Sequence, residues 1–114
     1  MPNSTDTIRG YHAHVYFDAM TLELARRICE QARDRFSIAM GRMHEKPVGP
    51  HPMWSCQLTV PADRFGEVVP WLLINREGLT VLVHPETGDA LRDHTEHAMW
   101  LGDSQTLSVE MFKA

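Results

Sequence analysis

An α+β fold, in which strands and helices alternate along one domain, is predicted by three patterns in the sequence. Residues 11–17 alternate between apolar and polar side chains with a period of two, as a half-buried strand does. Residues 21–36 repeat apolar side chains every three or four positions, which is typical of an amphipathic helix. Strand, helix and strand signals then recur between residues 53 and 84. A length of 114 residues suits a single domain over residues 1–114.

The first predicted strand, residues 11–17, has two chemically distinct faces. The face expected to enter the core carries Ala13, Val15 and Phe17. The other face carries His12, His14 and Tyr16. Because side chains alternate along a strand, this second face is the one on which we expect function.

The segment from residue 21 to residue 52 contains a helix, a strand and a stiff loop. The apolar side of the helix is predicted to comprise Leu24, Ala25, Ile28, Cys29, Ala32 and Phe36. A second strand is predicted over residues 37–44. Beyond it, Pro47, Pro50 and Pro52 force an irregular loop, because proline fixes φ and restricts the residue before it. His51 lies inside this loop.

A second strand–helix–strand passage follows. A third strand, residues 53–60, ends before Pro61, which suits the first turn of a helix that runs to about Asn75. Pro70 is expected to bend this helix. The fourth strand, residues 79–84, ends on His84. The buried side of the second helix is predicted to be Phe65, Val68, Val69, Leu72 and Leu73.

The order βαββαβ is that of a ferredoxin-like sandwich, an antiparallel sheet with both helices on one face. The other face would be open, so we expect a homodimer or a C-terminal segment to cover it. Residues 88–114 are predicted to add a short helix and a last strand at residues 107–112. Residues 1–9 are polar and are expected to form a flexible N-terminus.

Composition argues against several classes of partner. The net charge of −4, without a run of Lys or Arg, gives no basic surface for nucleic acid. No apolar stretch reaches the ~20 residues of a membrane helix, and residues 1–9 do not resemble a signal peptide. We therefore expect a cytoplasmic protein that binds neither nucleic acid nor membrane. Cys29 and Cys56 are expected to be buried, reduced thiols.

Seven histidines are the most informative feature of the composition. In the predicted topology the first strand is antiparallel to the fourth, which brings His12 near His84. His14 points the same way as His12, at a Cα separation of about 7 Å. Three imidazoles could then hold catalytic Zn²⁺ or non-haem Fe²⁺, and for iron a carboxylate is commoner as the third ligand. Asp93 and Glu86 are the candidate carboxylates.

Each histidine motif taken alone has a simpler interpretation. A His-x-His pair on a strand is often solvated polar decoration, and Asp93 before His94 is typical of a helix start. The convergence of three separate segments on one face favours a site. Trp54, beside the proline-rich loop, could line a pocket for a flat ligand, and Arg42 could bind a carboxylate.

Four motifs give the chain a resemblance to the DOPA 4,5-dioxygenase family. They are Tyr-His-Ala-His-Val-Tyr-Phe-Asp at 11–18, Val-Gly-Pro-His-Pro at 48–52, Val-Leu-Val-His-Pro-Glu-Thr-Gly at 81–88, and Arg-Asp-His-Thr-Glu-His-Ala-Met-Trp-Leu-Gly at 92–102. The resemblance covers about residues 11–102. It implies extradiol cleavage of a catechol such as L-DOPA by O₂ at a non-haem Fe²⁺ centre.

In such a mechanism the metal lowers the pKa of the catechol oxygens while an imidazole that is not a ligand moves the proton. From the predicted geometry we assign His12, His14 and His84 to the metal, although His51 could replace one of them. The other assignments are hypotheses of the same kind. Acid/base or substrate-orienting work is assigned to His51 and His94, substrate contact to Tyr16, Arg42 and Trp54, and His44 and His97 rank last.

Two other functions fit the same residues. A Zn²⁺-dependent lyase or hydrolase could use the three histidines with a bound water. A metal-free dimeric module could instead bind a small aromatic metabolite on the open face. Catechol-dependent O₂ uptake with Fe²⁺ but not with Zn²⁺ would exclude the Zn²⁺-dependent enzyme and favour a dioxygenase. Ligand binding that survives loss of His14 would favour the second.

Overall fold

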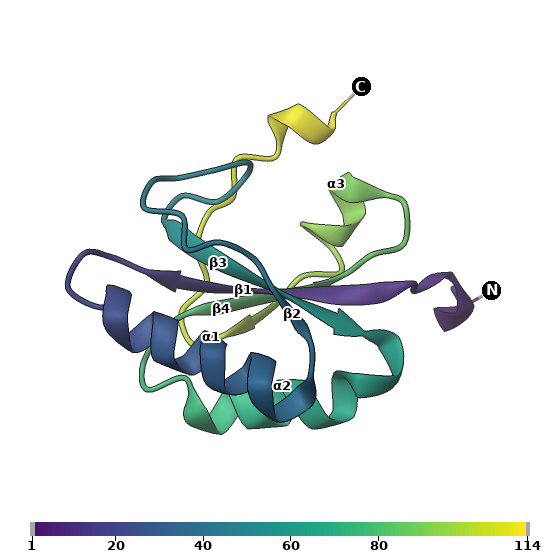
Figure 1. Ribbon diagram of the computed structural model, residues 1–114. Helices are drawn as coiled ribbons and strands as arrows, with labels where there is room; N and C mark the ends of the chain where they lie inside the picture. Colours follow the sequence, from purple (N-terminus) through teal and green to yellow (C-terminus); the bar gives the residue numbers. More distant parts are fainter. Residues whose placement is uncertain (1, 114) are drawn as a thin grey trace.

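The computed structural model describes residues 2–113 and is built around one antiparallel sheet with two helices on one face (Figure 1). The five strands lie in the order β2-β3-β1-β4-β5. They are β1 (Gly10–Phe17), β2 (Ala39–Met40), β3 (Trp54–Pro61), β4 (Val81–Pro85) and β5 (Met99–Leu101). The helices are α1 (Leu22–Phe36), α2 (Phe65–Asn75) and the short α3 (Ala90–Asp93). This arrangement confirms the predicted ferredoxin-like α+β fold.

Local signals explain where α1 begins and ends. Asp18 organises the preceding turn, because its Oδ1 accepts hydrogen bonds from the backbone N–H groups of Met20 and Thr21, both at 3.0 Å. The helix ends at Phe36, and the following Ser37 adopts a left-handed conformation with φ of 54° and closes the last turn. The chain then runs directly into β2.

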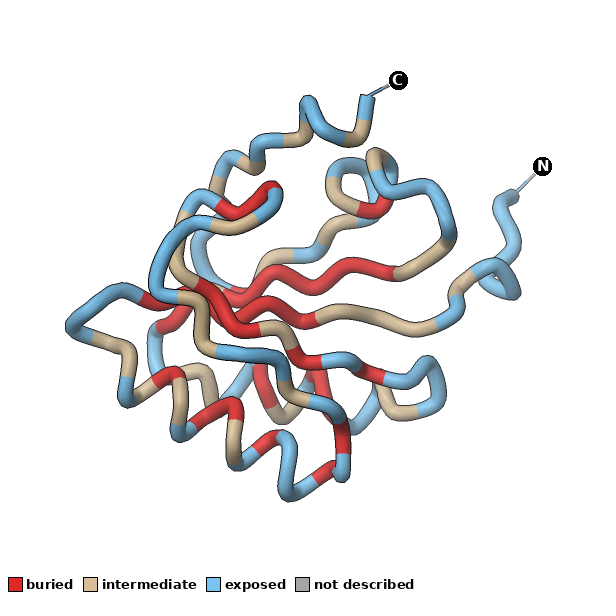
Figure 2. The backbone as a smooth tube through the Cα atoms, turned by 45° about the horizontal axis from the view of Figure 1, so that its top comes forward, coloured by how far each residue is buried: buried red, intermediate tan, exposed pale blue. Residues whose placement is uncertain are grey.

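The core lies between the sheet and the two long helices. Figure 2 shows the buried residues concentrated in the central strands and along one side of each helix. Ala13, Val15 and Phe17 are buried on the helix side of β1, as predicted. The prediction that Leu73 lies on the buried side of α2 is wrong, because this residue is 50% exposed. The buried stripe follows Val68, Val69 and Leu72 with helical spacing, and Leu73 falls beyond its edge.

The C-terminal region differs from the prediction of a last strand at residues 107–112. The added strand is β5, in which Trp100 pairs with Leu82 on the free edge of β4. The chain leaving α3 reaches that edge first, and an edge accepts only one strand. Residues 110–112 form a 3-10 turn instead, and the Ser108 N–H donates to the carbonyl of Pro50 at 2.9 Å. The predicted short helix is confirmed as α3.

Three segments rise over the sheet face that the helices leave free: the loop 41–53, the α3 region and the C-terminal segment (Figure 1). This face is therefore covered within one chain. A homodimer stays a prediction. Residues 5–7, in the N-terminus expected to be flexible, form a 3-10 turn. Within residues 2–113 no helix is long and apolar enough to cross a membrane.

Candidate metal centre

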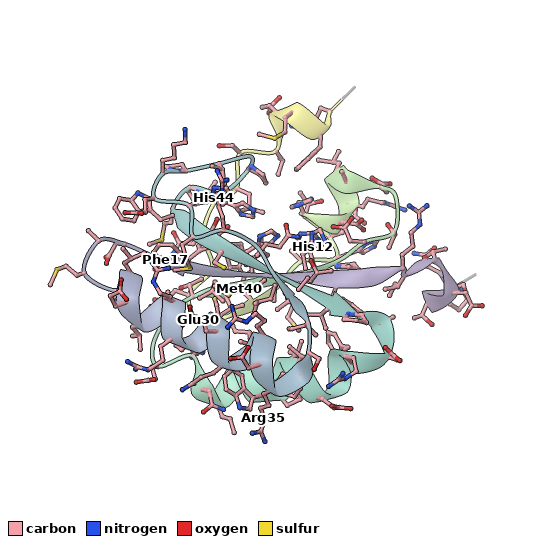
Figure 3. All side chains as sticks on the ribbon, in the orientation of Figure 1. His12, Phe17, Glu30, Arg35, Met40 and His44 are labelled. Atoms are coloured by element: carbon pink, nitrogen blue, oxygen red, sulfur yellow. The ribbon has the colours of Figure 1, made fainter. Side chains whose placement is uncertain are left out.

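Three histidines meet on the face of the sheet opposite α1 and α2. His12 and His84 are direct partners in the antiparallel register of β1 and β4, so their side chains share one face. His14 follows two residues along β1 on that face. One ring nitrogen from each of the three lies within 4.8 Å of the others. Figure 3 places His12 on the side of the sheet away from Glu30 and Arg35 of α1.

The donor set fits a divalent transition metal. The Nε2 atoms of His14 and His84 lie 3.1 Å apart, and two ligands of a tetrahedral zinc site with bonds of ~2.05 Å are separated by about 3.3 Å. His84 Nδ1 lies 3.0 Å from the carbonyl of Pro85, and His12 Nδ1 lies 2.9 Å from Glu86 Oε1. Both contacts leave Nε2 available, the pattern that outer hydrogen bonds impose on metal-binding histidines.

The two candidate carboxylates support the site without joining the group of three. Glu86 Oε1 lies behind His12 and is 3.7 Å from His84 Nδ1. Asp93 is 2% exposed and accepts hydrogen bonds from the backbone N–H and the hydroxyl of Thr87 at 2.8 and 2.7 Å. It therefore fastens the loop after β4 to α3. The sequence carried a signal for Glu86, because it lies two residues beyond His84.

Replacing Glu86 by alanine is expected to weaken metal binding about ten- to hundredfold, because His12 loses the acceptor that fixes its ring. Glutamine at the same position retains an acceptor oxygen and should cost less. A competition titration with a chromogenic chelator measures both affinities. Glu23→Ala, on the exposed surface of α1, is the control. Unchanged affinity in Glu86→Ala would contradict the supporting role of this carboxylate.

Two further histidines complete the cluster from separate segments. His51 reaches the site because the loop 41–53 folds over the sheet, and its ring centroid lies 4.1 Å from that of His14. His94, at the end of α3, lies 4.1 Å from the ring of His84. The strand order alone predicts this loop at the far end of β1, from which His51 can reach the site only by folding over the sheet or from a dimer partner. In the structure the loop folds over within the same chain. Five imidazoles occupy one site.

The C-terminal segment packs over the cluster, which is one of the two expected ways of covering this face, although no sequence pattern indicated its contact with His94. The ring of Phe112 stacks on His94 at a centroid distance of 4.5 Å. The contact between Ser108 and Pro50 holds the same segment against the loop of His51. As a result His51 is 7% exposed and His84 only 1%. The site is a protected one.

Burial keeps the imidazoles of His12, His14, His51 and His84 neutral. Desolvation lowers the pKa of His84 and of His51 to about 4, and the neighbouring histidines add to the effect. Desolvation and the same crowding hold the pKa of His14 well below its ordinary value. The pKa of the half-buried His12 is also lowered by desolvation, although Glu86 opposes the shift. Neutral imidazoles offer the lone pairs that a metal needs.

Of the three residues predicted to contact the substrate, the structure places one beside the histidine cluster and two away from it. Tyr16 is 1% exposed, and its hydroxyl lies 2.7 Å from His51 Nδ1. Trp54 packs edge-on against Phe17 on the helix side of the sheet, away from the histidines. Arg42 is exposed on the loop after β2, and the structure does not bring it into the cluster.

The two histidines ranked last lie outside the five-membered cluster. His44 pairs through its backbone with Ser55. His97 Nδ1 lies 3.4 Å from Asp93. Cys29 and Cys56 are free and buried, as expected.

Fold and site together define a ferredoxin-like protein with a buried, histidine-rich site suited to a metal ion. The family model for the Dopa 4,5-dioxygenase family matches residues 11–111. The chain belongs to the Dopa 4,5-dioxygenase family.

Known relatives agree with this assignment. The chain is 34% identical to a DOPA 4,5-dioxygenase of Amanita muscaria over 90% of its length, and 38% identical to an uncharacterized 21.2 kDa protein of Botryotinia fuckeliana over 93%. It spans only 49% and 65% of these two proteins, respectively. A crystal structure of a candidate dioxygenase from Nostoc punctiforme matches with a TM-score of 0.95 and 46% identity, covering 98% of this chain and 97% of that one.

Proposed function

We propose that the protein is an extradiol ring-cleaving dioxygenase that uses O₂ and a non-haem Fe²⁺ centre to open a catechol such as L-DOPA. The observation that carries the proposal is the convergence of His12, His14 and His84 within 4.8 Å on a protected sheet face. Membership of the Dopa 4,5-dioxygenase family supports it, as does the name of the Amanita muscaria relative.

In this proposal His12, His14 and His84 hold the metal through Nε2. When bound, Fe²⁺ would act as a Lewis acid toward the two oxygens of the diol. His51 contacts the ring of His14 and His94 contacts the ring of His84, so both are available to move or orient the hydroxyl protons. Both atoms of O₂ enter the ring-opened product, so protons that leave the diol must return during the reaction.

Burial of the cluster supports chemistry with O₂, because a protected site excludes water from reactive species. The small apolar surroundings contributed by Phe112 and Tyr16 also suit a flat aromatic substrate. We propose a small catechol as the only organic partner.

The test is O₂ consumption by metal-free protein that has been loaded anaerobically with Fe²⁺ and then mixed with catechols, L-DOPA among them. We expect uptake that depends on Fe²⁺ together with a yellow ring-opened product. The same protein without metal is the control. Absence of uptake with every catechol, in protein shown to retain Fe²⁺, would refute the proposal.

An all-histidine ligand set is also typical of catalytic zinc, and neither Glu86 nor Asp93 supplies a ligand in the group of three. A Zn²⁺-dependent lyase or hydrolase is therefore the second candidate. It predicts turnover without O₂ in Zn²⁺-loaded protein. Loading parallel samples with Fe²⁺ and Zn²⁺ and following O₂ decides between the two.

A further inference from the structure

The hydrogen-bond partners of the ring nitrogens distinguish the histidines of the cluster. His84 and His94 each direct Nδ1 at a backbone carbonyl, that of Pro85 at 3.0 Å and that of Ala90 at 2.7 Å. His12 directs Nδ1 at the carboxylate of Glu86. Carbonyl and carboxylate oxygens accept hydrogen bonds but do not donate them. When each of these rings carries a single proton, that proton is therefore on Nδ1, and Nε2 carries the lone pair.

His51 is different, because its Nδ1 faces a hydroxyl. The Tyr16 oxygen lies 2.7 Å from His51 Nδ1, and a phenol can donate as well as accept. Tyr16 is 1% exposed, and no other acceptor for its hydroxyl is found in residues 2–113. A buried O–H group without an acceptor has lost its hydrogen bonds to water and gained none in exchange, which is costly. Donation from Tyr16 to Nδ1 satisfies both groups.

We propose that Tyr16 is a positioning residue that fixes His51 as the Nε2–H tautomer, so that His51 offers a hydrogen-bond donor while His94 offers an acceptor. The hydrogen-bond partner of Nδ1 thus makes Nε2 a donor in His51 and an acceptor in His94. His51 is then not a metal ligand, since one nitrogen accepts from Tyr16 and the other bears a proton.

The two polarities suit the two oxygens of a diol, an assignment that rests on the proposed function. His94 Nε2 can accept the hydrogen bond of a hydroxyl, and the Nε2–H of His51 can donate to an oxygen of the bound substrate. Each ring lies 4.1 Å from a proposed ligand, His94 from His84 and His51 from His14. Donor and acceptor are therefore presented by two separate segments beside the proposed ligands and can orient the ring.

The tautomers are measurable without turnover. In protein labelled with ¹⁵N-histidine, long-range ¹H–¹⁵N correlation spectra in mildly alkaline buffer distinguish a protonated from an unprotonated ring nitrogen. We expect His94 as the Nδ1–H tautomer and His51 as the Nε2–H tautomer, in metal-free protein and in protein loaded with diamagnetic Zn²⁺. His51→Gln and His94→Gln assign the signals. An Nδ1–H tautomer at His51 would overturn the proposal, whatever the activity.

Tyr16→Phe removes only the hydroxyl. We expect His51 to lose its single tautomer in the spectra, and kcat/KM for a catechol to fall about three- to tenfold, the worth of one hydrogen bond, with metal content unchanged. Tyr11→Phe is the matched control, because Tyr11 packs on Phe65 away from the histidines. An unaltered His51 spectrum in Tyr16→Phe refutes the proposal. The expected spectra in a protein inactive toward every catechol would refute the proposed function alone.

Discussion

Alanine at His14 or His84 is expected to abolish stoichiometric binding of Fe²⁺ or Zn²⁺, whereas alanine at His51 or His94 is expected to preserve it and impair turnover. The difference follows from geometry. Both His14 and His84 present Nε2 to the same point, 3.1 Å apart. His51 and His94 pack beside these ligands with tilted rings, at centroid distances of 4.1 Å, and do not belong to the group of three.

The expected loss is large. Removal of an outer hydrogen-bond partner already costs ten- to hundredfold in metal affinity, and loss of a direct ligand should exceed that range. Metal analysis after loading and desalting gives the stoichiometry, and a chelator competition gives the affinity. His84→Gln provides a second variant, in case the smaller alanine side chain leaves a cavity in the buried site.

His97→Ala is the matched control, because His97 lies outside the cluster against Asp93. It should bind metal like the unmodified protein. The assignment of ligands would be contradicted if His51→Ala lost its metal as completely as His14→Ala. Full metal content in His84→Ala would contradict it equally.

The metal-free protein is expected to lose stability as the pH falls from about 7.5 to about 5, a range in which most carboxylates are still ionised. The pKa of His51 and of His84 is lowered to about 4 in the folded protein, chiefly by desolvation. An unfolded chain binds these protons near pH 6.5. The unfolded state takes up these protons at a higher pH than the folded state does. The free energy of unfolding is therefore highest above about pH 6.5 and declines as the pH falls toward 4.

The decline should amount to roughly 2 kcal/mol for each of these two histidines over that interval. His14, whose pKa is also held low, adds to it. Urea denaturation of metal-free protein at several pH values measures the slope. His84→Gln should show a shallower slope, because one proton-linked group is gone. Stability that is constant across the interval would contradict the buried neutral state of the cluster.

Much of the fold followed from side-chain periodicity. The alternation in residues 11–17 and the helical repeat in residues 21–36 match β1 and α1 closely, because each buries one face against the same core. The last strand was misplaced. Periodicity in residues 107–112 does not reveal that the edge of β4 is already occupied by Met99–Leu101, which is a property of chain path rather than of local pattern.

Site residues on paired strands could be placed from the sequence, because strand pairing fixes which residues are neighbours. Site residues on loops could not be placed in this way. His12 and His84 could be placed together because antiparallel pairing makes them partners. Trp54 could not be excluded from the sequence, since its position on the helix side depends on the register of β3 against β1. The stacking of Phe112 on His94 carries no sequence signal, because it depends on how the C-terminal segment returns.

The sequence by itself determined the alternating strands and helices and the face on which His12 and His14 lie, because both depend on short-range periodicity. It also carried the family motifs. Only the tertiary structure decided that the loop of His51 folds over the sheet and that Glu86 supports His12 from behind. It alone decided that Tyr16 meets His51. Those contacts join residues far apart in the chain, and the hydrogen-bonding character of each imidazole depends on the atom that it meets there.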